Sequence, residues 1–139
     1  MIALDTDHVS ALAQPAGVRG QRLAARLRAV RGAAVCVPIV AVEEQMRGWL
    51  ASIVKERQVT RQVSAYRELR NLFSFFAPFR ILAFDDAAVE VFETLGAIRI
   101  GTMDKKIASV ALANSALLLT ANRRDFEKVP GLNFDNWMD

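Results

Sequence analysis

The chain begins with Met1-Ile2-Ala3-Leu4-Asp5-Thr6-Asp7-His8, in which a short apolar run stops at a carboxylate. An apolar run followed by an acid and a polar turn is typical of a buried strand of a parallel sheet. Ligands of open α/β sheets bind just beyond the carboxyl ends of the strands. We therefore expect Asp5 at the rim of a pocket, with Asp7 close by.

The alternative interpretation is that an aspartate here only caps the following helix. For Asp7 the two interpretations have equal support. For Asp5 a site is favoured, because further acids occur at comparable places later in the chain. The only histidine, His8, is interpreted as a structural residue with satisfied hydrogen bonds.

Length and composition indicate one domain, residues 1–139. Apolar residues make up 53% of the chain, which favours a fully covered sheet or a partner surface. No apolar run approaches the roughly 18 residues that a membrane span needs, and no signal-peptide pattern is present. The single cysteine, Cys36, cannot form an internal disulfide. We therefore expect a cytoplasmic protein that does not associate with a membrane.

The net charge of +3 is unevenly distributed, because no acid occurs between Asp7 and Glu43. The arginines of this acid-free segment are Arg19, Arg22, Arg26, Arg28 and Arg31. The planar guanidinium fork suits phosphate, so a polyanionic ligand is one interpretation. On charge alone, a solvated helix face is the favoured one.

Short apolar runs alternate with amphipathic segments, which predicts an α/β protein with a parallel sheet. Strands are expected at residues 2–5, 33–37, 81–84 and 116–119, with an edge strand at 132–134. Helices are expected at residues 8–13, 18–31, 39–54 and 58–77, from Asp85 or Asp86 to Leu95, and after Thr102. Pro15 is expected to break the first helix, and Thr102 to cap the last.

Glu43 and Glu44 lie in the second turn of the helix expected at 39–54. On an ideal helical wheel Glu43 falls on the apolar stripe, and Glu44 falls near its flank. A carboxylate on a core-facing stripe is costly unless it is paired or bound to a cation. At least one of these glutamates is therefore a candidate site residue.

Acidic residues occur at four comparable positions, each directly after a strand or in an early helix turn. They are Asp5, the Glu43–Glu44 pair, Asp104, and Asp125 with Asn122. Two follow strands and two lie in early helix turns, so one rim of a parallel sheet can hold them all. Clustered carboxylates retain protons unless a cation neutralises them. Hard oxygen ligands select Mg²⁺ or Mn²⁺, which support phosphoryl chemistry by activating water and stabilising the leaving oxygen. Sequence motifs for phosphate-binding loops, zinc sites and serine hydrolases are absent.

Four segments together resemble the PIN-domain family and, within it, the VapC-type toxins of bacterial toxin–antitoxin pairs. They are Leu4-Asp5-Thr6-Asp7, Glu44 to Gly48, Asp104 with Ile107-Ala108, and Leu119-Thr120-x-Asn122-x-x-Asp125-Phe126. The resemblance implies a three-layer α/β/α sandwich around a central, mainly parallel sheet. It also implies a Mg²⁺-dependent endoribonuclease, usually a homodimer, which is held inactive by a cognate antitoxin.

The resemblance assigns the catalytic and metal-binding roles to Asp5, Glu44, Asp104 and Asp125. The family glutamate lies four residues before a glycine, which is Gly48 here, so Glu44 is preferred and Glu43 is the alternate. A hydroxyl residue often lies three residues before that glutamate, but here this position is Ala41.

Other residues receive supporting roles. Asp7, Thr120 and Asn122 are expected to contact the metal-binding acids, with Asn122 as a neutral helper. Arg47, Arg99 and Arg123 are candidates to bind the RNA phosphates, and ordinary surface charges are an equally supported interpretation of these arginines.

Two rival functions stay open. One is a catalytically inactive PIN-like module that binds RNA or a protein partner. The other is a small-molecule Mg²⁺ phosphohydrolase of the haloacid-dehalogenase type, because Asp5-Thr6-Asp7 matches its Asp-x-Asp spacing. Lys105 and Lys106 are badly placed for the lysine motif of that class.

Overall fold

The computed structural model describes residues 1–14 and 16–139. Its sheet contains the strands β1 (Ile2–Leu4), β2 (Val35–Pro38), β3 (Arg80–Leu82), β4 (Leu117–Leu119) and β5 (Phe134–Asp135). The strand order is β3-β2-β1-β4-β5, and each neighbouring pair is parallel. The expected parallel sheet is therefore confirmed, and the carboxyl ends of its strands meet at one edge.

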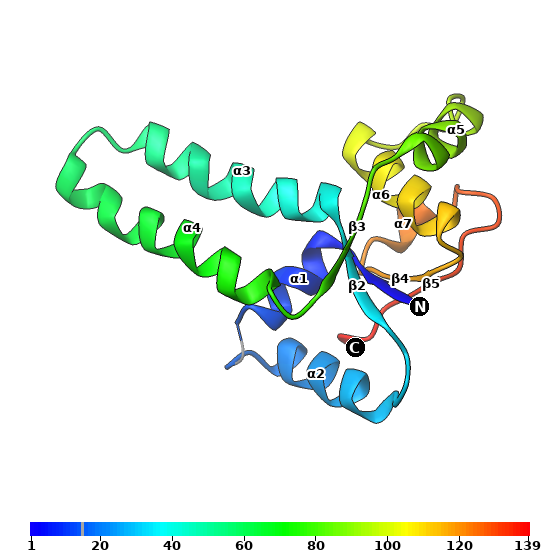
Figure 1. The fold of residues 1–139 in the computed structure, drawn as a ribbon, viewed down its shortest axis with the longest axis horizontal. Coiled ribbons are helices and arrows are strands. Elements are labelled where there is room, and N and C mark those ends of the chain that lie inside the picture. Colours follow the sequence, from blue (N-terminus) through cyan, green and yellow to red (C-terminus); the bar gives the residue numbers. More distant parts are fainter. Residues whose placement is uncertain (15) are drawn as a thin grey trace.

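Helices cover both faces of the sheet. They are α1 (Thr6–Leu12), α2 (Val18–Ala29), α3 (Ile39–Lys55), α4 (Val63–Phe76), α5 (Asp86–Thr94), α6 (Thr102–Ala113) and α7 (Arg123–Phe126). Figure 1 shows α1 to α4 on one side of the strands and α5 to α7 on the other, with α3 and α4 forming a long hairpin that extends away from the sheet. The three-layer α/β/α architecture is thus confirmed.

The apolar run at the start of the chain forms the central strand. Ala3 and Leu4 of β1 are completely buried, as are Leu118 and Leu119 of the neighbouring β4. From β1 the chain runs outward through β2 to β3, and it then returns past β1 to form β4. The order reverses between β1 and β4, so their carboxyl ends form the crevice in which ligands of such sheets bind.

Several sequence-based boundaries were wrong for identifiable reasons. The helix expected at 8–13 already starts at Thr6, because Asp5 caps it directly after the strand. Gly101, not Thr102, is the N-cap of α6. The helix expected at 58–77 begins as a 3₁₀ turn, Val59–Gln62, before α4.

At the C-terminal end, Asn122 caps the short helix α7, for which the sequence analysis predicted no element. The edge strand is β5 rather than residues 132–134. The helix break expected at Pro15 lies outside the described residues. None of the helices in the described part of the chain combines the length and apolar character that a membrane span requires.

Gly20 of α2 and Gly48 of α3 provide a matched test of this packing. A Cβ at Gly20 would collide with the Ala11 carbonyl oxygen of α1, whereas a Cβ at Gly48 would meet no atom within 4 Å. We expect Gly20→Ala to lower the free energy of unfolding by about 1–3 kcal/mol through overpacking. Gly48→Ala should be neutral or stabilising by up to about 1 kcal/mol. Equal urea midpoints for Gly20→Ala and the wild type would contradict the close contact between α1 and α2.

Candidate functional site

Asp5 lies at the carboxyl end of β1 and is only 5% exposed. The Thr120 hydroxyl, which follows β4, donates to Asp5 Oδ2 at 2.7 Å. The Thr6 backbone N–H donates to Asp5 Oδ1, also at 2.7 Å. Asp5 therefore caps α1 and also occupies the crevice between β1 and β4, so the two interpretations of this residue are compatible.

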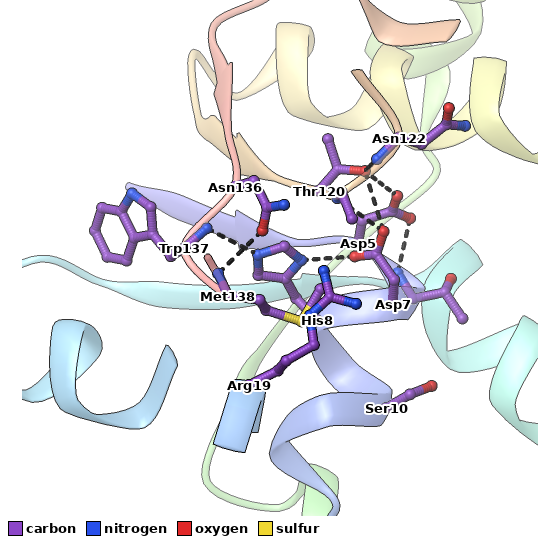
Figure 2. A network of polar contacts seen from close by, with 12 residues as sticks. Asp5, Asp7, His8, Ser10, Arg19, Thr120, Asn122, Asn136, Trp137 and Met138 are labelled. Carbon is purple, nitrogen blue, oxygen red and sulfur yellow. Dashed lines mark hydrogen bonds and ion pairs between the residues drawn. The ribbon is translucent and has the colours of Figure 1, made fainter. Parts of the chain in front are cut away.

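Asp7 connects three separate parts of the chain, as Figure 2 shows. Its Oδ2 accepts the Ala121 backbone N–H at 2.8 Å, and its Oδ1 contacts His8 Nδ1 at 2.6 Å. His8 Nε2 accepts the Trp137 backbone N–H at 3.2 Å. Because Nε2 is an acceptor, the ring proton lies on Nδ1 and is donated to Asp7. The capping interpretation of Asp7 is therefore replaced by a bridge to the turn after β4.

Glu44, and not Glu43, faces the first acidic stretch. The Thr6 hydroxyl donates to Glu44 Oε1 at 2.8 Å. Glu43 is 36% exposed and pairs with Arg47 at 2.6 Å. The helical wheel, which placed Glu43 on the apolar stripe, was wrong. The buried residue Ala41 lies three residues before Glu44, and side chains at this spacing share one face of a helix.

Asn122 brings the last two acids together. Its amide Nδ2 lies 3.4 Å from Asp104 Oδ2 and 3.1 Å from Asp125 Oδ2. Asp104 comes from the first turn of α6, and Asp125 comes from α7, which Asn122 itself caps. The Asp125 carboxylate also lies 3.7 Å from Lys128 Nζ. The Asn122 amide thus lies between two carboxylates that would otherwise repel each other.

The electrostatics show that these acids form one group. Burial, followed by the negative charge of Asp7, raises the pKa of Asp5 to about 7, even though Thr120 and Thr6 donate to it. Burial also raises the pKa of Asp104, and the charges of Glu44 and Asp125 raise it further. For Asp7, burial opposes ionisation, but the hydrogen bonds from His8 and Ala121 outweigh it and lower the pKa. The negative charges of this acidic group are therefore not fully balanced by nearby donors and cations.

The donor set fits a hard divalent cation. Carboxylate, hydroxyl and amide oxygens are the groups that Mg²⁺ and Mn²⁺ prefer. A cation would favour the ionised carboxylates against the burial and the repulsion that raise the pKa values of Asp5 and Asp104. Within residues 1–14 and 16–139, no three acidic, histidine or cysteine side chains form a preformed metal cluster. Ion binding would therefore require side-chain adjustment.

The three candidate arginines are differently placed. Arg47 is 71% exposed in its pair with Glu43, and Arg123 pairs with Asp135 at 3.6 Å. The Arg99 carbonyl accepts a hydrogen bond from Lys128 Nζ, and the Arg99 side chain belongs to an exposed residue. Among the ion pairs of the described residues, none joins these arginines to the four acids.

The role of Thr6 and one contact of His8 were not predicted from the sequence. Thr6 supplies the hydroxyl contact to Glu44 that Ala41 cannot make, and its position between Asp5 and Asp7 was the available signal. His8 is completely buried, as expected of a structural histidine. Its link to the backbone of Trp137 joins residues 129 positions apart, and no local pattern predicts that contact.

Comparisons with known proteins agree with the fold. A family model described as PIN domain matches residues 2–132. VapBC-1 from nontypeable Haemophilus influenzae is similar with a TM-score of 0.78 and 20% identity, covering 100% of both chains. DNA-bound VapBC from Salmonella typhimurium has a TM-score of 0.77 and 20% identity, and the match covers 99% of each chain. VapBC2 from Rickettsia felis, bound to a promoter DNA fragment, has a TM-score of 0.74 and 21% identity, and the match again covers 99% of each chain. A search of curated proteins found no significant match.

The raised pKa of Asp5 predicts a pH-dependent cost to stability. The folded protein binds the Asp5 proton more tightly than the unfolded chain, in which the pKa of Asp5 is 3.8. The contribution of Asp5 to stability therefore falls as pH rises from about 4 through about 7. Asp5→Asn does not titrate and should be more stable than the wild type above pH 7, by roughly 2–4 kcal/mol. This gain should shrink towards pH 4.

Urea unfolding in chelator across this pH range provides the measurement. Asp86→Asn, which changes an exposed acid in α5, is the control and should show no such trend. A gain for Asp5→Asn that is the same at pH 5 and pH 8 would contradict the shifted pKa.

Proposed function

Because the chain belongs to the PIN domain family, we propose that it is a Mg²⁺-dependent endoribonuclease that acts as the toxin of a toxin–antitoxin pair. The main support is the group formed by Asp5, Glu44, Asp104 and Asp125 at the carboxyl edge of the sheet. Two members of this group have raised pKa values because of burial and neighbouring negative charge. Such a group suits a cation-assisted attack on a phosphodiester.

In this proposal the four acids hold Mg²⁺, with Mn²⁺ as an alternative ion. When bound, the ion activates water and stabilises the charge that develops on the leaving oxygen. The protein's own contribution is orientation. Thr120 and the Thr6 N–H fix the Asp5 carboxylate, and the Thr6 hydroxyl fixes Glu44.

The supporting residues hold the two strand ends in register. Asp7 binds the Ala121 N–H and thereby fixes the turn that carries Thr120. The Thr120 hydroxyl also accepts the Asn122 N–H at 3.0 Å. Asn122 can therefore keep its amide between Asp104 and Asp125 while the carboxylates adjust to an ion.

The toxin role rests on the solved structures of similar fold, which contain VapB with VapC, and on exposed apolar side chains of this chain. Val54, Val59 and Phe73 of the α3–α4 hairpin are 84%, 77% and 67% exposed. We propose that these side chains, which lie along the hairpin, contribute to a protein interface. We propose a cognate antitoxin and a second copy of the chain as the partners, in the cytoplasm.

Arg47, Arg99 and Arg123 remain proposed phosphate ligands. The surface ion pairs of Arg47 with Glu43 and of Arg123 with Asp135 are worth only about 0–1 kcal/mol each. An RNA phosphate could therefore replace either carboxylate at little cost.

The phosphohydrolase alternative has less support. The Asp5 carboxylate is 5% exposed and accepts hydrogen bonds from Thr120 and the Thr6 N–H, so it is poorly placed to attack a small phosphate ester. Lys105 lies over the Phe92 ring and Lys106 over the Phe84 ring. The inactive binding module is disfavoured because all four carboxylates are present together.

The two adjacent glutamates provide a matched test of the nuclease. Glu44→Gln removes a charge from the acidic group and should lower RNA cleavage in Mg²⁺ by at least about 100-fold, because a metal-binding charge is lost. Glu43→Gln breaks only an exposed ion pair and should retain most activity. Wild-type cleavage should stop in chelator and return with Mg²⁺ or Mn²⁺. The assay is gel analysis of RNA fragments, and the reverse order of the two variants would exclude Glu44 as the site glutamate.

Expression in a bacterium without antitoxin tests the toxin role. The wild type should arrest growth by degrading RNA, whereas Asp5→Asn should be harmless at matched soluble expression, because it removes a site charge but keeps the side-chain size. Growth curves and immunoblots provide the measurement. Equal arrest by the two proteins would refute toxicity through metal-dependent cleavage.

A further inference from the structure

A groove of about 420 Å³ opens beside the acidic group, between α1, α3 and α4. Glu44 lines this groove and also belongs to the acidic group, so the two are continuous. The other walls include Ser10 of α1, Gln45 and Trp49 of α3, and Leu72 of α4. Neither the hydrogen bonds around Asp5 nor the metal-binding role proposed for the acids uses these walls.

Gly48 forms part of the groove and has no structural explanation of its own. Glycine in a helix interior costs about 1 kcal/mol relative to alanine, and Gly48 lies well inside α3. Its backbone has no positive φ, and a Cβ there would meet no atom within 4 Å. Neither backbone conformation nor packing therefore requires glycine. What its missing side chain does provide is open space in the groove next to Glu44.

The chemistry of the walls identifies what fits. The described residues that line the groove include Glu44 and Glu68 but no lysine, arginine or histidine, so a phosphate would be repelled. The remaining polar walls are uncharged. Gln45 Nε2 donates to Ser10 Oγ at 2.7 Å, which leaves the Gln45 carbonyl oxygen and the Ser10 hydroxyl proton for a ligand. Trp49 adds an indole ring at the same place.

An aromatic ring beside uncharged donors and acceptors is the combination that binds an unstacked base of single-stranded RNA. We propose that this groove is a base subsite, in which Trp49 stacks on an RNA base near the cleaved phosphodiester, and Ser10 and Gln45 bind its edge. The inference rests on the proposed nuclease function and extends it to a determinant of sequence preference.

The test is Mg²⁺-dependent cleavage of mixed-sequence single-stranded RNA, followed by sequencing of the products. Trp49→Ala should lower kcat/KM by about 10–100-fold, mainly through KM, because base stacking contributes of this order. It should also weaken the base preference at one position next to the cut. Trp49→Phe should retain most of the cleavage efficiency and most of the base preference. Leu50→Ala changes an exposed neighbour that does not line the groove and is the matched control.

A second variant removes no packing. Gly48→Leu should fill the groove and lower cleavage by at least about tenfold while the fold stays intact, whereas Gly48→Ala should have a smaller effect. If Trp49→Ala and Gly48→Leu both cleave with wild-type efficiency and base preference, the subsite is refuted and a protein partner becomes the better occupant, while the nuclease stands. If the wild type fails to cleave RNA in Mg²⁺, the proposed function itself is refuted, and the subsite with it.

Discussion

The hydrogen bond from the Thr120 hydroxyl to the buried carboxylate of Asp5 couples the fold to the candidate site. It joins residues 115 positions apart, at the ends of the two strands between which the strand order reverses. A buried carboxylate is tolerated only where it has partners, and here the partners are the turn after β4 and the first turn of α1. The backbone supports the same junction, because the Asp5 N–H donates to the Leu119 carbonyl at 2.9 Å. If the register of β1 and β4 changed, this carboxylate would lose its main donor.

The same junction explains why the C-terminal segment matters to a site at the start of the chain. The Trp137 backbone binds His8, and His8 in turn orients Asp7. The guanidinium of Arg26 lies 4.7 Å from the centre of the Trp137 ring, so α2 also contacts this segment. Asp7 is therefore held ionised by fixed donors, and its charge adds to burial in raising the pKa of Asp5. Proteins commonly accept such local instability where a functional group needs it.

The parts of this arrangement that follow local rules were predictable from sequence. The apolar run before Asp5 identified β1, and the acids after strands and in early helix turns identified the members of the acidic group. The choice between Glu43 and Glu44 was harder to predict, because an ideal helical wheel contains no information on which residues of α3 face the body of the protein. The contacts of Thr6 with Glu44 and of His8 with Trp137 depend on how distant segments pack. No periodicity or motif encodes them.

Two glycines that look alike in the sequence have different surroundings in the structure. Gly20 and Gly48 both lie inside helices, and both carry the same intrinsic cost. At Gly20 the cost is offset by the close approach of α1, whose Ala11 carbonyl occupies the place of a side chain. At Gly48 nothing in the described part of the chain fills that place, although the residue borders a groove that leads to Glu44. The folded chain itself does not offset this cost. Under the proposed nuclease function, an RNA substrate that enters the groove would account for it.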